Sequence, residues 1–83
     1  MDVKLSRQQH RVLVVEDSPT QALQLRLLLE ADGFRVDIVT CLAAAIEFVS
    51  RVQVDIIAFD LMLPDSTGID GLREMLQAAS RVP

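Results

Sequence analysis

Short apolar runs alternate with amphipathic segments along this chain, and this alternation restricts the possible folds more than any other feature of the sequence. Residues 11–16 (RVLVVE) are rich in β-branched side chains and do not alternate, as expected of a parallel strand buried on both faces. Further strand-like runs occupy residues 34–39 and 54–60, and helical periodicity marks residues 19–31, 41–51 and 69–80. Strands that alternate with helices in this way predict an α/β fold built on a parallel sheet.

The first helix has clear boundary signals. Ser18 stands at the N-cap, Pro19 at the first helical position and Gln21 at the third, which together complete a capping box. Gly33 supplies the stop, because glycine readily takes the left-handed conformation that ends many helices. We therefore expect this helix to span residues 19–31.

The other helix starts are predicted from single residues. Thr40 is the expected N-cap of the second helix, and Asp65 and Asp70 are expected to cap or charge the start of the third. The apolar residues expected to face the sheet are Ala22, Leu25, Leu28 and Leu29 in the first helix, Leu42, Ala45, Ile46 and Val49 in the second, and Ile69, Leu72, Leu76 and Ala79 in the third.

Right-handed crossover connections, which are nearly universal, fix the side of the sheet that each helix covers. If the second and third strands flank the first, the strand order is 2-1-3, with the first helix on one face and the other two on the opposite face. The nearly continuous apolar run at residues 54–60 favours a central strand, although the order 2-1-3 makes it an edge strand of this chain. Because the winding reverses between the first and third strands, a crevice forms at their C-terminal ends, where open α/β sheets bind ligands.

Three acidic side chains are predicted to meet at this crevice. Glu16 and Asp17 leave the first strand and Asp60 leaves the third, and neighbouring strands lie roughly 4.8 Å apart. Carboxylates that close need a proton or a hard cation, and oxygen ligands without Cys or His favour Mg²⁺. A carboxylate beside such an ion can attack phosphorus to form an acyl phosphate, and Asp60 is the best candidate nucleophile. The structural alternative is that these residues only cap helices or loops.

Two motifs resemble the receiver domains of bacterial two-component response regulators: VLVVEDSP at residues 12–19 and DLMLPDSTG at residues 60–68. The family pattern places an acidic pair after the first strand. It then has a strand-terminal Asp followed at positions +3, +4 and +8 by an apolar residue, Pro and Gly, here Leu63, Pro64 and Gly68. The resemblance covers nearly the whole chain and implies a flavodoxin-like parallel sheet.

The resemblance also implies a function and a ligand set. Asp60 would accept a phosphoryl group from a histidine kinase or a histidine phosphotransfer protein. Asp17 and Asp60 would contact Mg²⁺, with Glu16 acting through water and the backbone carbonyl of Met62 as a further ligand. Such a module is a phosphoaccepting regulator and not an enzyme, with weak autophosphatase chemistry at most. A haloacid-dehalogenase-like phosphatase would need a second acidic residue two positions after the nucleophile, where Met62 stands.

The sequence departs from the family after the third helix. Receiver domains have a fourth strand that delivers a Ser or Thr and a fifth that delivers a Lys, whereas here Pro83 falls where the fourth strand should begin. The only lysine, Lys4, precedes the first strand. We therefore expect residues 1–10 to be a polar leader and residues 11–83 a partial receiver domain, truncated to (βα)3 and impaired in phosphotransfer.

Truncation would leave apolar surface uncovered. The bare edge of the third strand, or the first helix with Leu23 and Leu27, predicts a homodimer. A non-enzymatic dimerisation or docking module that keeps only the acidic pocket is the alternative function.

Composition excludes several partners. The formal net charge is −4 and the basic residues are scattered, which argues against direct nucleic-acid binding. Cys41 is the only cysteine, so an internal disulfide is excluded and a reducing, cytoplasmic location is expected. The apolar runs are too short to cross a membrane, and the polar N-terminus has no signal core.

Overall fold

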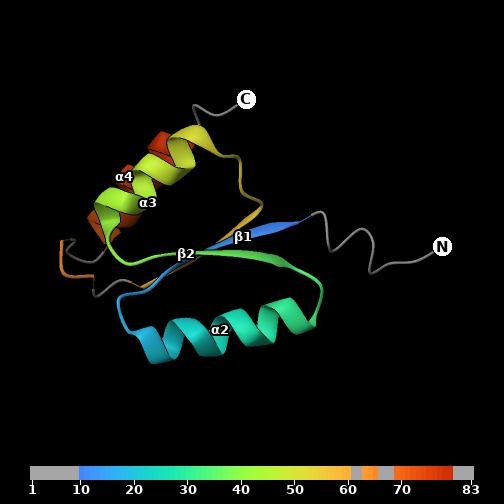
Figure 1. Ribbon diagram of the computed structural model, residues 1–83. Coiled ribbons are helices and arrows are strands. Elements are labelled where there is room, and N and C mark those ends of the chain that lie inside the picture. The colour runs from blue at the N-terminus through green and yellow to red at the C-terminus, as the bar shows by residue number, and fades with distance from the viewer. Residues whose placement is uncertain (1–9, 61–62, 66–68, 80–83) are drawn as a thin grey trace.

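The computed structural model describes residues 10–60, 63–65 and 69–79, which form a three-stranded sheet between two layers of helices (Figure 1). The elements in chain order are β1 (Arg11–Val15), α2 (Pro19–Ala31), β2 (Arg35–Val39), α3 (Leu42–Arg51), β3 (Ile56–Phe59) and α4 (Ile69–Ala79). The predicted α/β class is confirmed. Apart from His10, the predicted leader lies outside the described residues, and so do Met62 and Gly68. None of the helices in these ranges has the length and apolarity needed to span a membrane.

The sheet has the predicted order. Its strands are all parallel and run β2-β1-β3, with Val12 of β1 paired to Val36 of β2 and to Ile56 of β3. Residues 12–15 of β1 are fully buried because strands cover both edges and helices cover both faces. β3 is shorter than the predicted run of residues 54–60, and it forms an edge of the described sheet on which Ile56 is 46% exposed.

Side chains of β1 alternate between two apolar clusters. Val12 and Val14 pack on the side of α2, whereas Leu13 and Val15 pack on the side of α3 and α4. Figure 1 shows α2 alone on one side of the sheet and the other two helices together on the opposite side, as right-handed crossovers predict.

Helix α2 begins and ends where the sequence predicts. The Ser18 hydroxyl accepts a hydrogen bond from the backbone N–H of Gln21 (3.3 Å), and Pro19 is the first helical residue. At the other end Gly33 has a φ of 93°, and the N–H groups of Gly33 and Phe34 donate to the carbonyls of Glu30 and Leu29. This is a Schellman motif, in which only glycine takes the left-handed backbone without a steric cost.

The predicted inner face of α2 is only partly correct. Ala22 is buried, and Leu25 and Leu29 are half-buried against the cluster under this helix. Leu28 is 71% exposed, however, so its predicted contact with the sheet is wrong. The reason is geometric, because six residues at about 100° each turn Leu28 some 120° away from Ala22. Leu23 and Leu27 are exposed, as expected for a helix that covers its sheet face alone.

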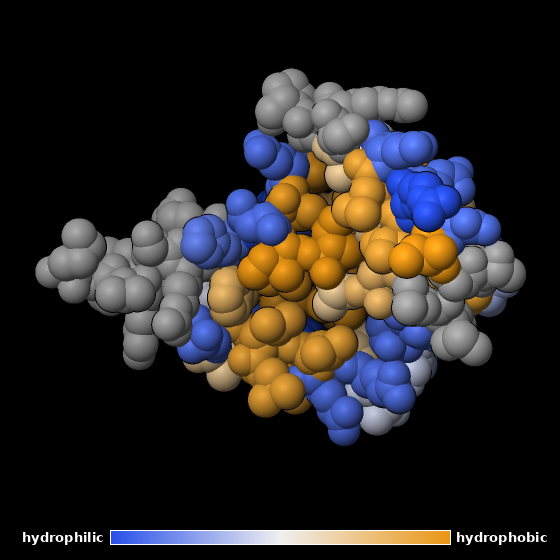
Figure 2. All heavy atoms as spheres, turned by 180° about the vertical axis from the view of Figure 1, so that it is seen from behind, coloured by the Kyte–Doolittle hydropathy of each residue, from blue (hydrophilic) through white to orange (hydrophobic). Residues whose placement is uncertain are grey.

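The predicted inner face of α4 is only partly correct. Leu72 and Ala79 pack against the core, as predicted, whereas the other two predicted residues are mostly exposed. Gly71, Met75 and Ala78 are buried, whereas Ile69 and Leu76 are 60% and 51% exposed. Gly71 and Ala78 have little or no side chain, so α3 can pack closely on that side. Ile69 and Leu76 are left on the outside of the helix. Figure 2 shows a broad apolar area on the face of the molecule opposite to the one seen in Figure 1.

The start of α3 also differs from the prediction. Its N-cap is Cys41 and not Thr40, and the Cys41 side chain makes no capping hydrogen bond. The carboxylate of Asp65 takes this role, accepting hydrogen bonds from the backbone N–H groups of Leu42 (2.7 Å) and Ala43 (3.0 Å). Asp65 therefore caps the second helix of the chain, not the third as predicted. Asp70 lies in the first turn of α4, as expected.

Candidate metal centre

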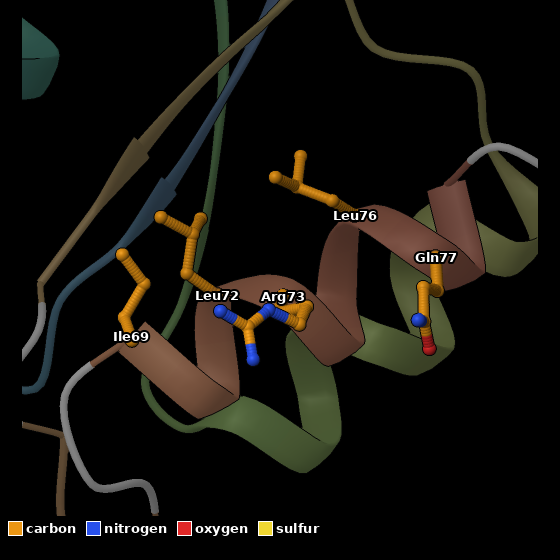
Figure 3. A pocket seen from close by; sticks show the side chains of 5 residues that line it. All are labelled: Ile69, Leu72, Arg73, Leu76 and Gln77. Atoms are coloured by element: carbon orange, nitrogen blue, oxygen red, sulfur yellow. The ribbon is translucent and has the colours of Figure 1, made fainter.

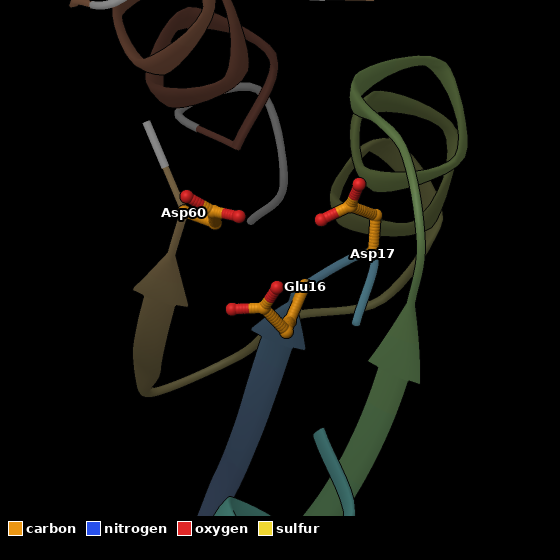
Figure 4. Close-up of side chains that lie close together, drawn as sticks. All are labelled: Glu16, Asp17 and Asp60. Carbon is orange, nitrogen blue, oxygen red and sulfur yellow. The ribbon is translucent and has the colours of Figure 1, made fainter. Parts of the chain in front are cut away.

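Three carboxylates meet at the C-terminal edge of the sheet, as predicted. Ligand atoms of Glu16, Asp17 and Asp60 all lie within 4.8 Å of one another. Figure 4 shows the three side chains around a common space, with Glu16 and Asp17 at the end of β1 and Asp60 at the end of β3. We call these three residues the carboxylate cluster.

Backbone hydrogen bonds continue the strand pairing one residue beyond the strands and thereby place the cluster. The N–H of Glu16 donates to the carbonyl of Val39 (3.0 Å), and the N–H of Asp60 donates to the carbonyl of Val15 (3.0 Å). Because β1 and β3 are parallel and in register, with Val15 paired to Phe59, the residues that follow them emerge side by side. The position of the acidic residues is thus set by the sheet itself.

The three carboxylates differ in burial and in their partners. Glu16 is buried, and its Oε2 accepts a hydrogen bond from the backbone N–H of Ser18 (3.0 Å). In a capping box, the side chain of Gln21 would accept a hydrogen bond from the Ser18 N–H. Here the Glu16 carboxylate accepts it instead, so only the other bond of the predicted capping box, from the Gln21 N–H to Ser18, is present. Asp17 is exposed and Asp60 is half-buried, which leaves both accessible from solvent.

A pocket gives access to the cluster. Its volume is about 140 Å³, and its lining residues are Val15, Glu16, Leu25, Ala58, Phe59 and Asp60. Asp60 is therefore accessible from outside the fold, and a reaction with an external group requires this access.

The donor set fits a hard divalent cation. All three ligands are carboxylate oxygens, the donors that Mg²⁺ prefers. In an octahedral site at about 2.1 Å, ligand oxygens lie roughly 3 to 4.2 Å apart, so a cluster within 4.8 Å needs only small side-chain movements to surround an ion. Met62, predicted to add a backbone carbonyl, lies outside the described residues.

Asp65 connects the segment after the cluster to α3, which sequence reasoning missed. The two backbone N–H groups that it accepts lower the pKa of its carboxyl below the ordinary value of 3.8, and the Cys41 thiol adds a weaker hydrogen bond in the same direction. No local signal marks this contact, since Leu42 lies 23 positions earlier in the chain. Only the folded path from β3 brings Asp65 to the start of α3.

The acidic edge of the sheet fits a known family. Residues 12–83 match the sequence profile of the response regulator receiver domain. The chain belongs to this family. It is a receiver domain of two-component signal transduction, as the two acidic motifs indicated.

Several curated proteins are similar to this receiver domain. The DNA-binding response regulator MtrA of Mycolicibacterium smegmatis is 38% identical over 73 residues, covering 88% of this chain and 32% of MtrA. The sensory transduction protein RegX3 of Mycobacterium tuberculosis is 42% identical over 72 residues, covering 87% of this chain and 31% of RegX3. MtrA of Mycobacterium leprae is 37% identical over 73 residues. The chain thus spans about a third of the length of these relatives.

The receiver domain has a second, larger pocket of about 420 Å³ on α4. In Figure 3, Ile69, Leu72 and Leu76 extend from one side of the helix, with Arg73 and Gln77 beside them. No residue of the carboxylate cluster lines this pocket. Its mainly apolar lining suits contact with protein surface and does not suit phosphoryl chemistry.

Proposed function

We propose that Asp60 is the phosphoacceptor of this receiver domain and takes its phosphoryl group from the phosphohistidine of a histidine kinase or histidine phosphotransfer protein. The observation that carries the proposal is the carboxylate cluster itself, with its ligand atoms within 4.8 Å at the edge where open α/β sheets bind ligands. Asp60 is suited to the role of nucleophile because it is accessible from the pocket beside it. Glu16 suits it less, because it is buried and already accepts the Ser18 N–H.

The proposed reaction is a phosphoryl transfer between two side chains. A carboxylate oxygen of Asp60 forms a bond to phosphorus while the phosphorus–nitrogen bond of the donor breaks, and the released imidazole nitrogen takes up a proton. Asp17 and Asp60 would hold Mg²⁺ directly, with Glu16 through water and the carbonyl of Met62 as a further ligand. When bound, the ion offsets negative charge on the phosphoryl oxygens.

The proposed role is regulatory. The chain would accept a phosphoryl group and slowly lose it by its own weak autophosphatase chemistry, and it would not turn over a substrate as an enzyme does. We propose that the 83-residue chain accepts the group slowly, because its only lysine, Lys4, precedes β1 in the sequence and does not match the position of the family's lysine, which follows the fifth strand. A cytoplasmic location is proposed with this function.

A second candidate function is a docking or dimerisation module, favoured by the exposed apolar surface. Ile56 lies on the edge of β3, and Leu23 and Leu27 lie on the outside of α2. We propose a homodimer formed through one of these surfaces, since edge strands and exposed apolar faces pair readily with a second copy. Light scattering after size exclusion tests this, and a stable monomer at tens of micromolar would rule it out.

Beryllofluoride with Mg²⁺ tests the phosphoacceptor proposal, because it mimics an aspartyl phosphate without a donor protein. We expect it to bind the chain and to fail on Asp60→Asn, which keeps the shape of the side chain and removes the nucleophilic charge. Asp55→Asn is the matched control, since Asp55 is exposed on the segment before β3 and bonds to the N–H of Arg11 at the opposite end of the sheet. Intact mass after acetyl phosphate treatment provides a second measurement. Binding that survives in Asp60→Asn would refute the assignment.

A further inference from the structure

We infer that Asp65 is a positioning residue for the carboxylate cluster, because its bond to α3 holds the chain that follows Asp60 to the same corner that holds Glu16. This inference rests on the proposed function and names a residue that the function does not otherwise use.

The contact itself is a two-pronged cap. One carboxylate oxygen of Asp65 accepts the N–H of Leu42 at 2.7 Å, and the other accepts the N–H of Ala43 at 3.0 Å. These N–H groups are among the four at a helix start that have no partner within the helix. Because the side chain of the N-cap residue Cys41 makes no capping bond, α3 obtains its cap from a distant segment. The cap is therefore a tertiary link as well as a helix terminus.

The two segments that carry the carboxylate cluster both form hydrogen bonds with one short segment between β2 and α3. We call residues 39–43 the β2–α3 corner. At one end of the corner, the carbonyl of Val39 accepts the N–H of Glu16 at 3.0 Å. At the other end, Leu42 and Ala43 donate to Asp65. The β2–α3 corner thus bonds to Glu16 at one end and to Asp65, five residues after Asp60, at the other.

Asp60 is held from both sides along its own strand. Upstream, its N–H donates to the carbonyl of Val15. Downstream, Leu63 is only 3% exposed and packs in the core between β1, α3 and α4, and Asp65 follows two residues later. Leu63 anchors the segment to the core, and Asp65 fixes it to the start of α3.

The electrostatics of the cluster explain why such a link would matter. Three like charges within 4.8 Å repel one another, so a chain segment that is free to move would carry its carboxylate out of the cluster. A metal site needs ligands that are already close, and residues that only orient ligands typically change metal affinity by about 10- to 100-fold when they are removed. Asp65 does not need to touch the ion to have this effect.

The test compares Asp65→Ala with Asp65→Asn and Asp55→Ala in the full 83-residue chain. Asp65→Ala removes both capping bonds, whereas Asp65→Asn keeps one acceptor oxygen and with it one of the two bonds. Asp55→Ala is the matched control because it also removes a carboxylate bond to a backbone N–H (2.7 Å, to Arg11), but at the far end of the sheet. By titration calorimetry we expect Asp65→Ala to weaken Mg²⁺ binding about tenfold, Asp65→Asn to recover part of this affinity, and Asp55→Ala to leave it unchanged.

The outcomes separate this inference from the proposed function. Equal losses in Asp65→Ala and Asp55→Ala, or no recovery in Asp65→Asn, would overturn the positioning role while leaving Asp60 as the phosphoacceptor. If the unmodified chain does not bind Mg²⁺, the proposed function fails, and amide hydrogen exchange then decides the inference without metal. Exchange at Asp60 should be faster in Asp65→Ala than in Asp65→Asn or Asp55→Ala, and equal exchange in all three would overturn it.

Discussion

Asp60→Asn should have opposite effects on stability with and without Mg²⁺. Ligand atoms of Asp60 lie within 4.8 Å of those of Glu16 and Asp17, so its charge takes part in two repulsive pairs. At this distance each pair costs about 0.9 kcal/mol in a water-like dielectric. Asparagine keeps an acceptor oxygen and removes the charge. We therefore expect the metal-free variant to be about 1 to 2 kcal/mol more stable than the unmodified chain at low salt.

Mg²⁺ should make the unmodified chain more stable than Asp60→Asn. A ligand that binds only the native state stabilises it by about 2.7 kcal/mol at 100 times its dissociation constant. The unmodified chain gains this stabilisation, whereas the variant has lost a ligand and the charge that attracts the ion. For a chain of this size, 1 kcal/mol corresponds to roughly 4 to 8 °C in the melting temperature, so both effects are measurable by circular dichroism.

The melting temperatures of both chains in EDTA and in Mg²⁺, at low and at high salt, provide the test. Added NaCl should shrink the metal-free difference, because screening weakens repulsion between solvent-accessible charges. Asp55→Asn, which changes a carboxylate far from the cluster, should shift neither temperature appreciably. If Asp60→Asn melts lower than the unmodified chain in EDTA, or if Mg²⁺ raises both equally, the cluster is not a site of charge repulsion relieved by metal.

Three further predictions follow from the structure. Asp17→Asn should abolish the Mg²⁺-dependent rise in melting temperature, and a full rise in that variant would exclude Asp17 as a ligand. Met75→Ala should cost about 2 to 4 kcal/mol in urea unfolding because Met75 is fully buried, whereas Leu76→Ala, at a residue 51% exposed, should cost far less. Hydrogen bonds from Leu42 and Ala43 hold the pKa of Asp65 below 3.8, so its stabilising contribution is present above that pH and is lost as the pH falls through the lower folded value. The stability gap between the chain and Asp65→Ala should therefore narrow below about pH 4 and stay constant above it.

The sheet and the cluster could be predicted because their signals are local or topological. The strand run at residues 11–16 identified the buried central strand, and the capping signals at Ser18 and Gly33 fixed both ends of α2. Right-handed crossovers then placed the ends of β1 and β3 side by side, which was enough to bring Asp60 to Glu16. None of these steps needed knowledge of how side chains pack.

The helix faces were predicted with mixed success, because they depend on the shape of the neighbour. Helix α3 buries Leu42, Ala45 and Val49 as predicted, whereas α2 and α4 were predicted only in part. In α4 the most apolar stripe includes Ile69 and Leu76, yet the helix buries Gly71 and Met75, where α3 can approach closely. The cap on α3 was missed for a related reason. Asp65 is as good a capping residue at α3 as at α4, and only the tertiary path of the chain decides between them.

The backbone, rather than the side chains, sets the position of the cluster, and this makes the site unusually easy to dissect. Glu16 and Asp60 are placed through N–H bonds to Val39 and Val15, so replacing a carboxylate by its amide changes charge without releasing the chain. Asp65 is different, because its side chain supplies a link of the kind that the sheet supplies elsewhere through backbone groups. Amide substitutions in the cluster should therefore report electrostatics, and alanine at Asp65 should report geometry. Asp60→Asn combined with Asp65→Ala should lose more order at β3 in hydrogen exchange than Asp60→Asn alone, and equal exchange would show that the sheet holds Asp60 without help from α3.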